Sequence, residues 1–147
     1  MRIYLDNCAM NRPFDDQSHI RIRIETEAKL FLQEKIKILE VELIWSYILE
    51  FENDQNPFEE KRLAIEKWEK LSVINIYETE KLITRADDLV LLGIKTKDAL
   101  HVSSAIEGNA DCFITTDDRL QKKLYGRDDI KAVNPVDIVG EIDEHNN

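Results

Sequence analysis

Short apolar segments alternate with longer amphipathic ones along the chain, and this alternation constrains the fold more than any other feature. Apolar residues recur at helical spacing in the longer segments, as Leu82, Ala86 and Leu89 do. Strands that alternate with helices predict a parallel sheet with helices on both faces. We therefore expect an α/β fold, a three-layer α/β/α sandwich around a central, mainly parallel sheet. The predicted strands are residues 2–6, 41–45, 73–76, 112–115 and 132–133, and the predicted helices are residues 18–37, 46–53, 56–71, 79–93, 96–108 and 117–124.

The length of the chain, 147 residues, predicts one domain with a single core. The sequence holds only four Gly and three Pro, so long flexible linkers are not expected. We expect the domain to span residues 1–139 and residues 140–147 to form a frayed acidic tail.

Several residues predict where helices begin and end. Ser18, Ser46, Thr79 and Thr96 are expected to cap helices through their hydroxyl groups. Gly93 is expected to end one of them, since glycine readily adopts the left-handed conformation found there. Asn56-Pro57 predicts a helix start, and residues 11–16 are expected to form a loop.

Hydropathy, charge and cysteine content indicate the cellular compartment of the protein and the classes of partner that it can bind. No apolar run approaches the roughly 18 residues of a membrane span, and the acidic start of the chain is unlike a signal peptide. We expect a cytoplasmic protein with no membrane contact, in which Cys8 and Cys112 are free thiols. The net charge of -10 argues against a protein that coats DNA. It is compatible with a metal enzyme or with a basic protein partner, although solubility alone also explains it.

Four acidic residues stand where an α/β sheet places its ligand site. Asp6 follows the first predicted strand and Asp117 follows the fourth, so both lie at carboxyl ends, where such sheets bind ligands. Asp98 continues the inward stripe of its helix, and Glu52 follows Ile48 and Leu49 on the apolar face of another. Each has a simpler explanation as a cap, a turn residue, a dipole partner or a solvated helix end.

Taken together, the four acids predict a metal site. Carboxylate oxygens are the ligands that Mg²⁺ and Mn²⁺ prefer, and clustered carboxylates need a cation to balance their charge. We expect Asp6 and Asp98 to ligate directly, and Glu52 and Asp117 to ligate directly or through water, with one or two metal ions.

Four segments in this order resemble the PIN domain family. They are Tyr4-Leu5-Asp6-Asn7-Cys8, the stretch from Ser46 to Glu52, Lys97-Asp98-Ala99-Leu100-His101 and Ile114-Thr115-Thr116-Asp117. Residues 11–16 and the stretch from Glu52 to Pro57 also look like a bacterial subgroup of VapC-like toxins. The resemblance covers roughly residues 1–138.

The resemblance implies a Mg²⁺- or Mn²⁺-dependent endoribonuclease, the toxin of a type II toxin-antitoxin pair. It places the family's acids on Asp6, Glu52, Asp98 and Asp117, which act in catalysis by holding the metal that activates water. From the resemblance we also expect that the protein can form a dimer and that a small, basic antitoxin inhibits it. Asn7 stands where many relatives have Thr or Ser, and Asn7, Arg12 and Thr116 are the candidate contacts to RNA.

Other functions remain open on the sequence alone. The domain could be a catalytically silent binding module of the PIN fold, or a stand-alone RNA-processing nuclease. A metal-dependent phosphatase is a weaker alternative, because Asp6 is followed by Asn7 and Cys8 and not by the Asp-x-Asp motif of one large phosphatase class. His101 is interpreted as a surface or core-edge histidine, and Cys8 is not expected to be a nucleophile, since no histidine is placed to activate it.

Overall fold

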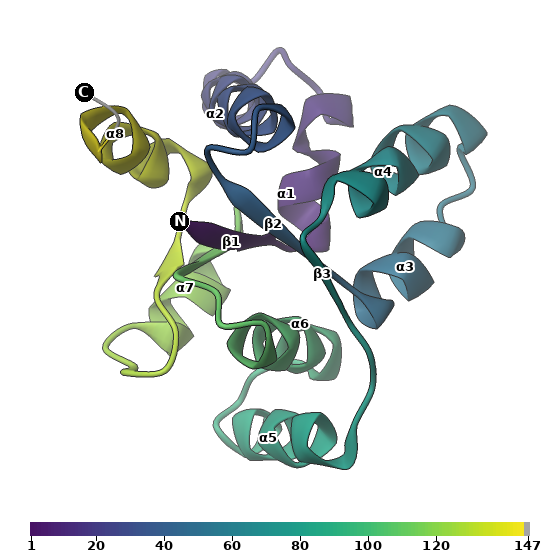
Figure 1. The fold of residues 1–147 in the computed structure, drawn as a ribbon, viewed down its shortest axis with the longest axis vertical. Coiled ribbons are helices and arrows are strands. Elements are labelled where there is room, and N and C mark those ends of the chain that lie inside the picture. Colours follow the sequence, from purple (N-terminus) through teal and green to yellow (C-terminus); the bar gives the residue numbers. More distant parts are fainter. Residues whose placement is uncertain (146–147) are drawn as a thin grey trace.

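A five-stranded parallel sheet forms the centre of the computed structural model, which describes residues 1–145 (Figure 1). The strand order is β3-β2-β1-β4-β5, and every neighbouring pair runs parallel. The predicted sheet is confirmed. The strands are β1 (Arg2–Leu5), β2 (Glu42–Ser46), β3 (Ile74–Ile76), β4 (Cys112–Ile114) and β5 (Ala132–Val133).

Helices cover both faces of the sheet, which makes the three-layer sandwich. In Figure 1, α1, α2, α4 and α8 lie on one side of the strands, and α5, α6 and α7 lie on the other. The helices are α1 (Asn7–Asn11), a 3-10 turn η1 (Arg12–Phe14), α2 (Ile20–Lys37), α3 (Tyr47–Asp54), α4 (Glu59–Leu71), α5 (Glu80–Leu91), α6 (Thr96–Glu107), α7 (Asp118–Leu124) and α8 (Pro135–His145). Within residues 1–145, no helix has the length and apolar character needed to cross a bilayer.

The central strand β1 is buried on both faces. Ile3, Tyr4 and Leu5 are all fully buried, and Tyr4 stacks on Phe113 of β4 with ring centroids 5.6 Å apart. Strands of a doubly covered parallel sheet are continuously apolar, because neither face meets water. The first strand therefore buries both of its faces, and Tyr4 is as much a core residue as Ile3 and Leu5.

The structure tests the predicted caps. Ser46 and Thr79 accept hydrogen bonds from the backbone N–H groups of Leu49 and Leu82, as predicted. Ser18 and Thr96 are not caps: His19 and Lys95 precede the two helices, without a capping side chain.

Two helices were not predicted. Residues 7–11 form α1, because Asp6 caps it, and the expected loop at residues 11–16 contains η1. Helix α8 continues to His145 and buries Ile138 and Ile142, so the described part of the acidic segment is helical and not frayed. The domain boundary at residue 139 stays a prediction, and residues 146–147 lie outside the described part of the chain.

A lysine is buried between α2 and α4. Lys29 is only 2% exposed, and its ammonium lies 5.4 Å from the centroid of the Trp68 ring. Burial disfavours the charged form and lowers the pKa of Lys29 from 10.5 to about 7. Between these two pH values the unfolded chain holds a proton that the folded chain has released, so the fold gains stability as the pH rises.

Lys29→Met should therefore stabilise the fold most at and below about pH 7. Its advantage over the wild type should shrink by about 1.4 kcal/mol for each pH unit between the folded and unfolded pKa values. Urea unfolding of both proteins at several pH values measures this. Lys37→Met is the matched control, because Lys37 faces the same ring at 5.9 Å from an exposed position. An advantage of Lys29→Met that is independent of pH, or one that Lys37→Met shares, would contradict the assignment.

Candidate metal site at the carboxyl edge of the sheet

The order of the strands places a topological switch point between β1 and β4. Strands β2 and β3 follow β1 in sequence and lie on one side of it. Strands β4 and β5 come later in the sequence and lie on the other side of β1. At such a switch point the connections leave in opposite directions and open a ligand site beyond the carboxyl ends of the strands. Asp6 directly follows β1 and Asp117 lies three residues after β4, so these two acids follow the strands on either side of the switch point.

Asp6 and Asp117 both cap helices. Capping was the simpler explanation predicted for Asp117, whereas the one predicted for Asp6 was a turn. Asp6 Oδ1 accepts a hydrogen bond from the backbone N–H of Ala9 at 3.0 Å. Asp117 Oδ1 accepts from the N–H groups of Arg119 and Leu120 at 2.9 and 3.2 Å. Asp6 is buried and Asp117 is exposed. These hydrogen bonds engage Oδ1 of each carboxylate, so capping and metal binding are compatible roles.

Asp98 is the least restrained of the four acids. It lies half-buried in the first turn of α6, and Ala99, Val102 and Ala105 on the same helix are fully buried, which confirms the predicted inward stripe. Among the residues that the structure describes, Asp98 has no hydrogen-bond partner. Burial raises the pKa of Asp98, and the negative charges of Asp6, Asp117 and Glu52 raise it further. The four acids predicted from the sequence therefore lie close enough to act on one another electrostatically.

Glu52 is held by a histidine. It lies on the inner side of α3, after the buried Ile48 and Leu49, while Glu50 faces solvent, so the predicted helix phase is confirmed. Glu52 Oε1 and His101 Nε2 are 2.7 Å apart. His101 is 2% exposed, so it is a core residue and not a surface one. Its place one turn after Asp98 on the inward face of α6 was the signal that could have revealed this contact.

The thiol beside Asp6 is unsuited to nucleophilic attack. Cys8 Sγ donates a hydrogen bond to Asp6 Oδ1 at 3.0 Å. Burial, and then the charge of Asp6, raise the pKa of Cys8 to about 12, so it stays a neutral thiol. Burial also raises the pKa of Asp6 itself, although hydrogen bonds from Thr115, Cys8 and the Ala9 N–H oppose the shift. Cys8 and Cys112 are both free, as predicted.

The donor chemistry of the four acids fits a hard divalent cation. All four offer carboxylate oxygens. Burial, and then the charges of Asp6, Asp117 and Glu52, raise the pKa of Asp98, although His101 opposes the shift. Among the side chains that the structure describes, no three of His, Cys, Asp or Glu are already arranged as a metal-binding group. Mutual repulsion opposes a closer approach of the acids, and a bound cation would balance it.

The three candidate RNA contacts lie around the same edge, in different environments. The Asn7 side chain pairs with Asn11 inside α1, and Thr116 is largely buried. Arg12 is already committed to other carboxylates: two of its nitrogens lie 2.9 and 2.7 Å from Glu25 Oε1, and a third lies 3.1 Å from Asp15.

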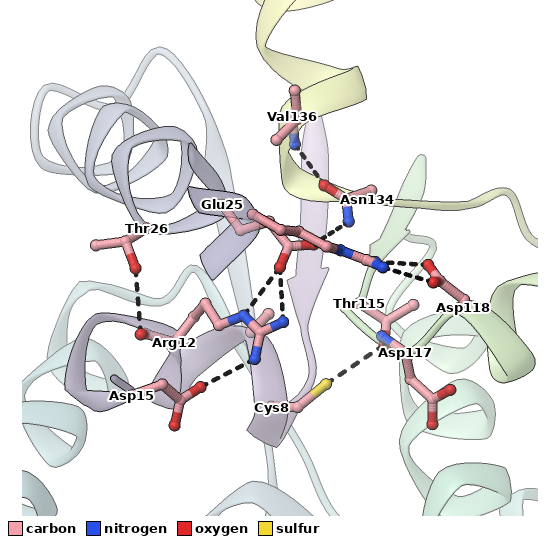
Figure 2. A network of polar contacts seen from close by, with 12 residues as sticks. Cys8, Arg12, Asp15, Glu25, Thr26, Thr115, Asp117, Asp118, Asn134 and Val136 are labelled. Atoms are coloured by element: carbon pink, nitrogen blue, oxygen red, sulfur yellow. Dashed lines mark hydrogen bonds and ion pairs between the residues drawn. The ribbon is translucent and has the colours of Figure 1, made fainter. Parts of the chain in front are cut away.

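Figure 2 shows this ion-pair network beside Cys8, Thr115 and Asp117. Glu25 is 1% exposed and also accepts hydrogen bonds from Arg21 and Asn134. Arg21 forms a two-point pair with Asp118 at 2.7 Å. The network ties α2 to the start of α7, and therefore to the segment that carries Asp117.

A parallel sheet with four acidic residues near its switch point, three of which act on the pKa of Asp98, defines an α/β domain with a candidate acidic metal site. The family model of the PIN domain matches residues 3–125, and the chain belongs to this family. The resemblance seen in the sequence is thereby confirmed.

Two solved structures are similar in fold. A chain of VapBC2 from Rickettsia felis, bound to a DNA fragment from its promoter, has a TM-score of 0.57 and 16% identity, covering 91% of this chain and 98% of that one. A chain of VapBC-1 from nontypeable Haemophilus influenzae has a TM-score of 0.57 and 17% identity, covering 92% and 98%. No curated protein matches the chain.

The repulsion at Asp98 predicts opposite effects of one substitution with and without metal. In EDTA, Asp98→Asn should stabilise the fold by up to about 1 kcal/mol, because it removes one of the like charges at a partly solvated site. Mn²⁺ should stabilise the wild type by about 2.7 kcal/mol when the free ion is 100-fold above its Kd, and should stabilise Asp98→Asn less. Thermal unfolding with EDTA and with Mn²⁺ measures both effects. An equal Mn²⁺ increment in the two proteins would place the metal elsewhere.

Proposed function

We propose that this protein is a metal-dependent endoribonuclease and the toxin of a type II toxin-antitoxin pair. The observation that carries the proposal is the group of four carboxylates near the switch point of a PIN domain, three of which raise the pKa of the fourth, Asp98, beyond the effect of its burial. The similarity in fold to chains of two VapBC complexes supports the toxin assignment. The two free thiols suit a reducing compartment, and we assign the activity to cytoplasmic RNA.

In the proposed mechanism, some residues of this chain bind the metal ion and others bind the RNA. Asp6 and Asp98 would hold Mg²⁺ or Mn²⁺ directly, and Glu52 and Asp117 would do so directly or through water. The bound ion would supply an activated water and would stabilise negative charge on the phosphate. Asn7 and Thr116 would hydrogen-bond the RNA backbone and orient the scissile phosphate. Arg12 would also contact the RNA phosphate if the phosphate displaces Glu25 from the Arg12 guanidinium.

Cleavage assays with matched glutamate variants test the nuclease assignment. Glu52 and Glu50 lie two residues apart in α3, so Gln at either position changes helix propensity equally, but only Glu52 faces the site. Glu52→Gln should slow Mn²⁺-dependent RNA cleavage by at least about 100-fold, because loss of even an outer hydrogen-bond partner of a metal ligand typically costs about 10- to 100-fold. Glu50→Gln should cleave like the wild type.

Assays with RNA and with a small phosphate ester distinguish a nuclease from a phosphatase and from a silent binding module. The wild type should cleave RNA with Mg²⁺ or Mn²⁺, should lose activity in EDTA and should not release phosphate from p-nitrophenyl phosphate. Hydrolysis of the small ester would favour a phosphatase. Binding of RNA without cleavage under any metal condition would favour a silent binding module.

The acidic cluster also predicts how a toxin partner would bind. An Arg or Lys from a small antitoxin could take the place of the cation among Asp6, Asp98 and Asp117 and so exclude the substrate phosphate. MgCl₂ should then weaken the partner complex more than NaCl of equal ionic strength, because screening alone is common to both salts. Asp6→Asn combined with Asp98→Asn should weaken it as well.

Titration calorimetry with the product of the neighbouring gene measures these affinities. A partner whose affinity ignores both MgCl₂ and the double substitution would inhibit by covering the groove instead. The absence of any partner in the cell would leave a stand-alone RNA-processing nuclease as the better assignment. Dimerisation of this chain remains a prediction.

A further inference from the structure

A buried chain of hydrogen bonds runs from the core to the candidate site. The backbone N–H of Leu49 donates to Ser46 Oγ at 3.2 Å, and Ser46 Oγ lies 2.6 Å from Tyr4 Oη. Tyr4 Oη lies 2.6 Å from His101 Nδ1, and His101 Nε2 lies 2.7 Å from Glu52 Oε1. Ser46, Tyr4 and His101 are all at most 2% exposed, so solvent does not compete with these bonds.

The groups at the two ends of this series of hydrogen bonds determine which group donates at each step. A backbone N–H can only donate, and an ionised carboxylate can only accept. One arrangement lets every group between them donate once: the Ser46 hydroxyl to Tyr4, the Tyr4 hydroxyl to His101 Nδ1, and His101 Nε2–H to Glu52. The reverse direction would leave the Ser46 hydroxyl hydrogen without an acceptor among residues 1–145. The imidazole is therefore assigned as the neutral Nε2–H tautomer.

We propose that Tyr4 and His101 are positioning residues that hold Glu52 Oε1 and thereby aim Oε2 at the metal site. The inference rests on the proposed function, since it assigns the orientation of one proposed ligand. Outer hydrogen bonds of this kind orient ligating carboxylates, and their loss typically weakens metal binding about 10- to 100-fold. This series of hydrogen bonds joins β1, the β2–α3 junction and α6, so three parts of the fold determine where one carboxylate points.

Two tyrosines provide a matched test. Tyr4→Phe removes only the hydroxyl that donates to His101, whereas Tyr47→Phe removes a neighbouring buried hydroxyl that has no hydrogen-bond partner in the described chain. Tyr4→Phe should raise the Kd for Mn²⁺ by about 10-fold, and Tyr47→Phe should leave it unchanged. Electron paramagnetic resonance of free Mn²⁺ measures both, with circular dichroism to verify folding. Equal Kd values for Tyr4→Phe and the wild type would overturn the proposal.

Two substitutions of the histidine separate positioning from packing. A Gln side chain at position 101 is long enough to donate to Glu52, whereas Asn reaches only the Tyr4 hydroxyl. Under the proposal, His101→Gln retains more Mn²⁺ affinity and more RNA cleavage than His101→Asn. Equal losses in the two folded variants would mean that His101 only fills space.

Imidazole ¹⁵N NMR distinguishes failure of this inference from failure of the proposed function. The wild type should show His101 as the Nε2–H tautomer, with Nδ1 unprotonated, and Tyr4→Phe should alter that signature while Tyr47→Phe should not. A different His101 tautomer in a wild type that cleaves RNA would overturn the positioning role alone. The expected tautomer in a wild type that binds no Mn²⁺ would overturn the metal site, and with it the role given to Glu52.

Discussion

The parallel hydrogen-bond ladder of β1 with β2 and β4 is the constraint on which the candidate site depends. Parallel strands end at one edge of the sheet, so residues that follow β1, β2 and β4 must gather there although more than 100 positions separate Asp6 from Asp117. Helix α6 runs back along the sheet and brings its first turn, with Asp98, to the same edge. The ladder in turn depends on burial of β1 on both faces, because water would otherwise compete for its backbone groups.

Gathering four carboxylates opposes folding, and the structure offsets this cost locally. One oxygen of Asp6 and one of Asp117 accept backbone N–H groups at helix N-termini, where the helix dipole also favours negative charge. One oxygen of Glu52 faces a histidine nitrogen. Asp98 receives no such bond in the described part of the chain, and its burial, together with the charges of the other three acids, raises its pKa. The acids that support the fold and the acids proposed to hold metal are thus the same residues, with different oxygens in each role.

The strands, the layers and the four acids were predictable because each follows from local pattern and from one topological rule. The Ser46 and Thr79 caps followed from residue type alone, and the phase of α3 followed from Ile48 and Leu49. The partners of His101 were predictable only in part. Its place one turn after Asp98 indicates the inward face of α6, but spacing within α6 does not identify the tyrosine from β1 and the glutamate from α3 that it contacts. Helix α8 was missed for a similar reason: its acidic sequence suggests a solvated tail, and only the tertiary structure buries Ile138 and Ile142.

On the proposed function, the net charge of -10 has a specific consequence for how the protein approaches RNA. Arg12 and Arg21 lie beside the acids, but Glu25, Asp15 and Asp118 already neutralise them, so neither can bind phosphate without breaking an ion pair. On the proposed function, the cation would then have two roles, since it would attract the substrate phosphate as well as activate the water. A basic segment of a partner protein would satisfy the same carboxylates without offering any water for attack. Occupancy of one acidic cluster by a metal ion or by a side-chain cation would therefore decide between activity and inhibition.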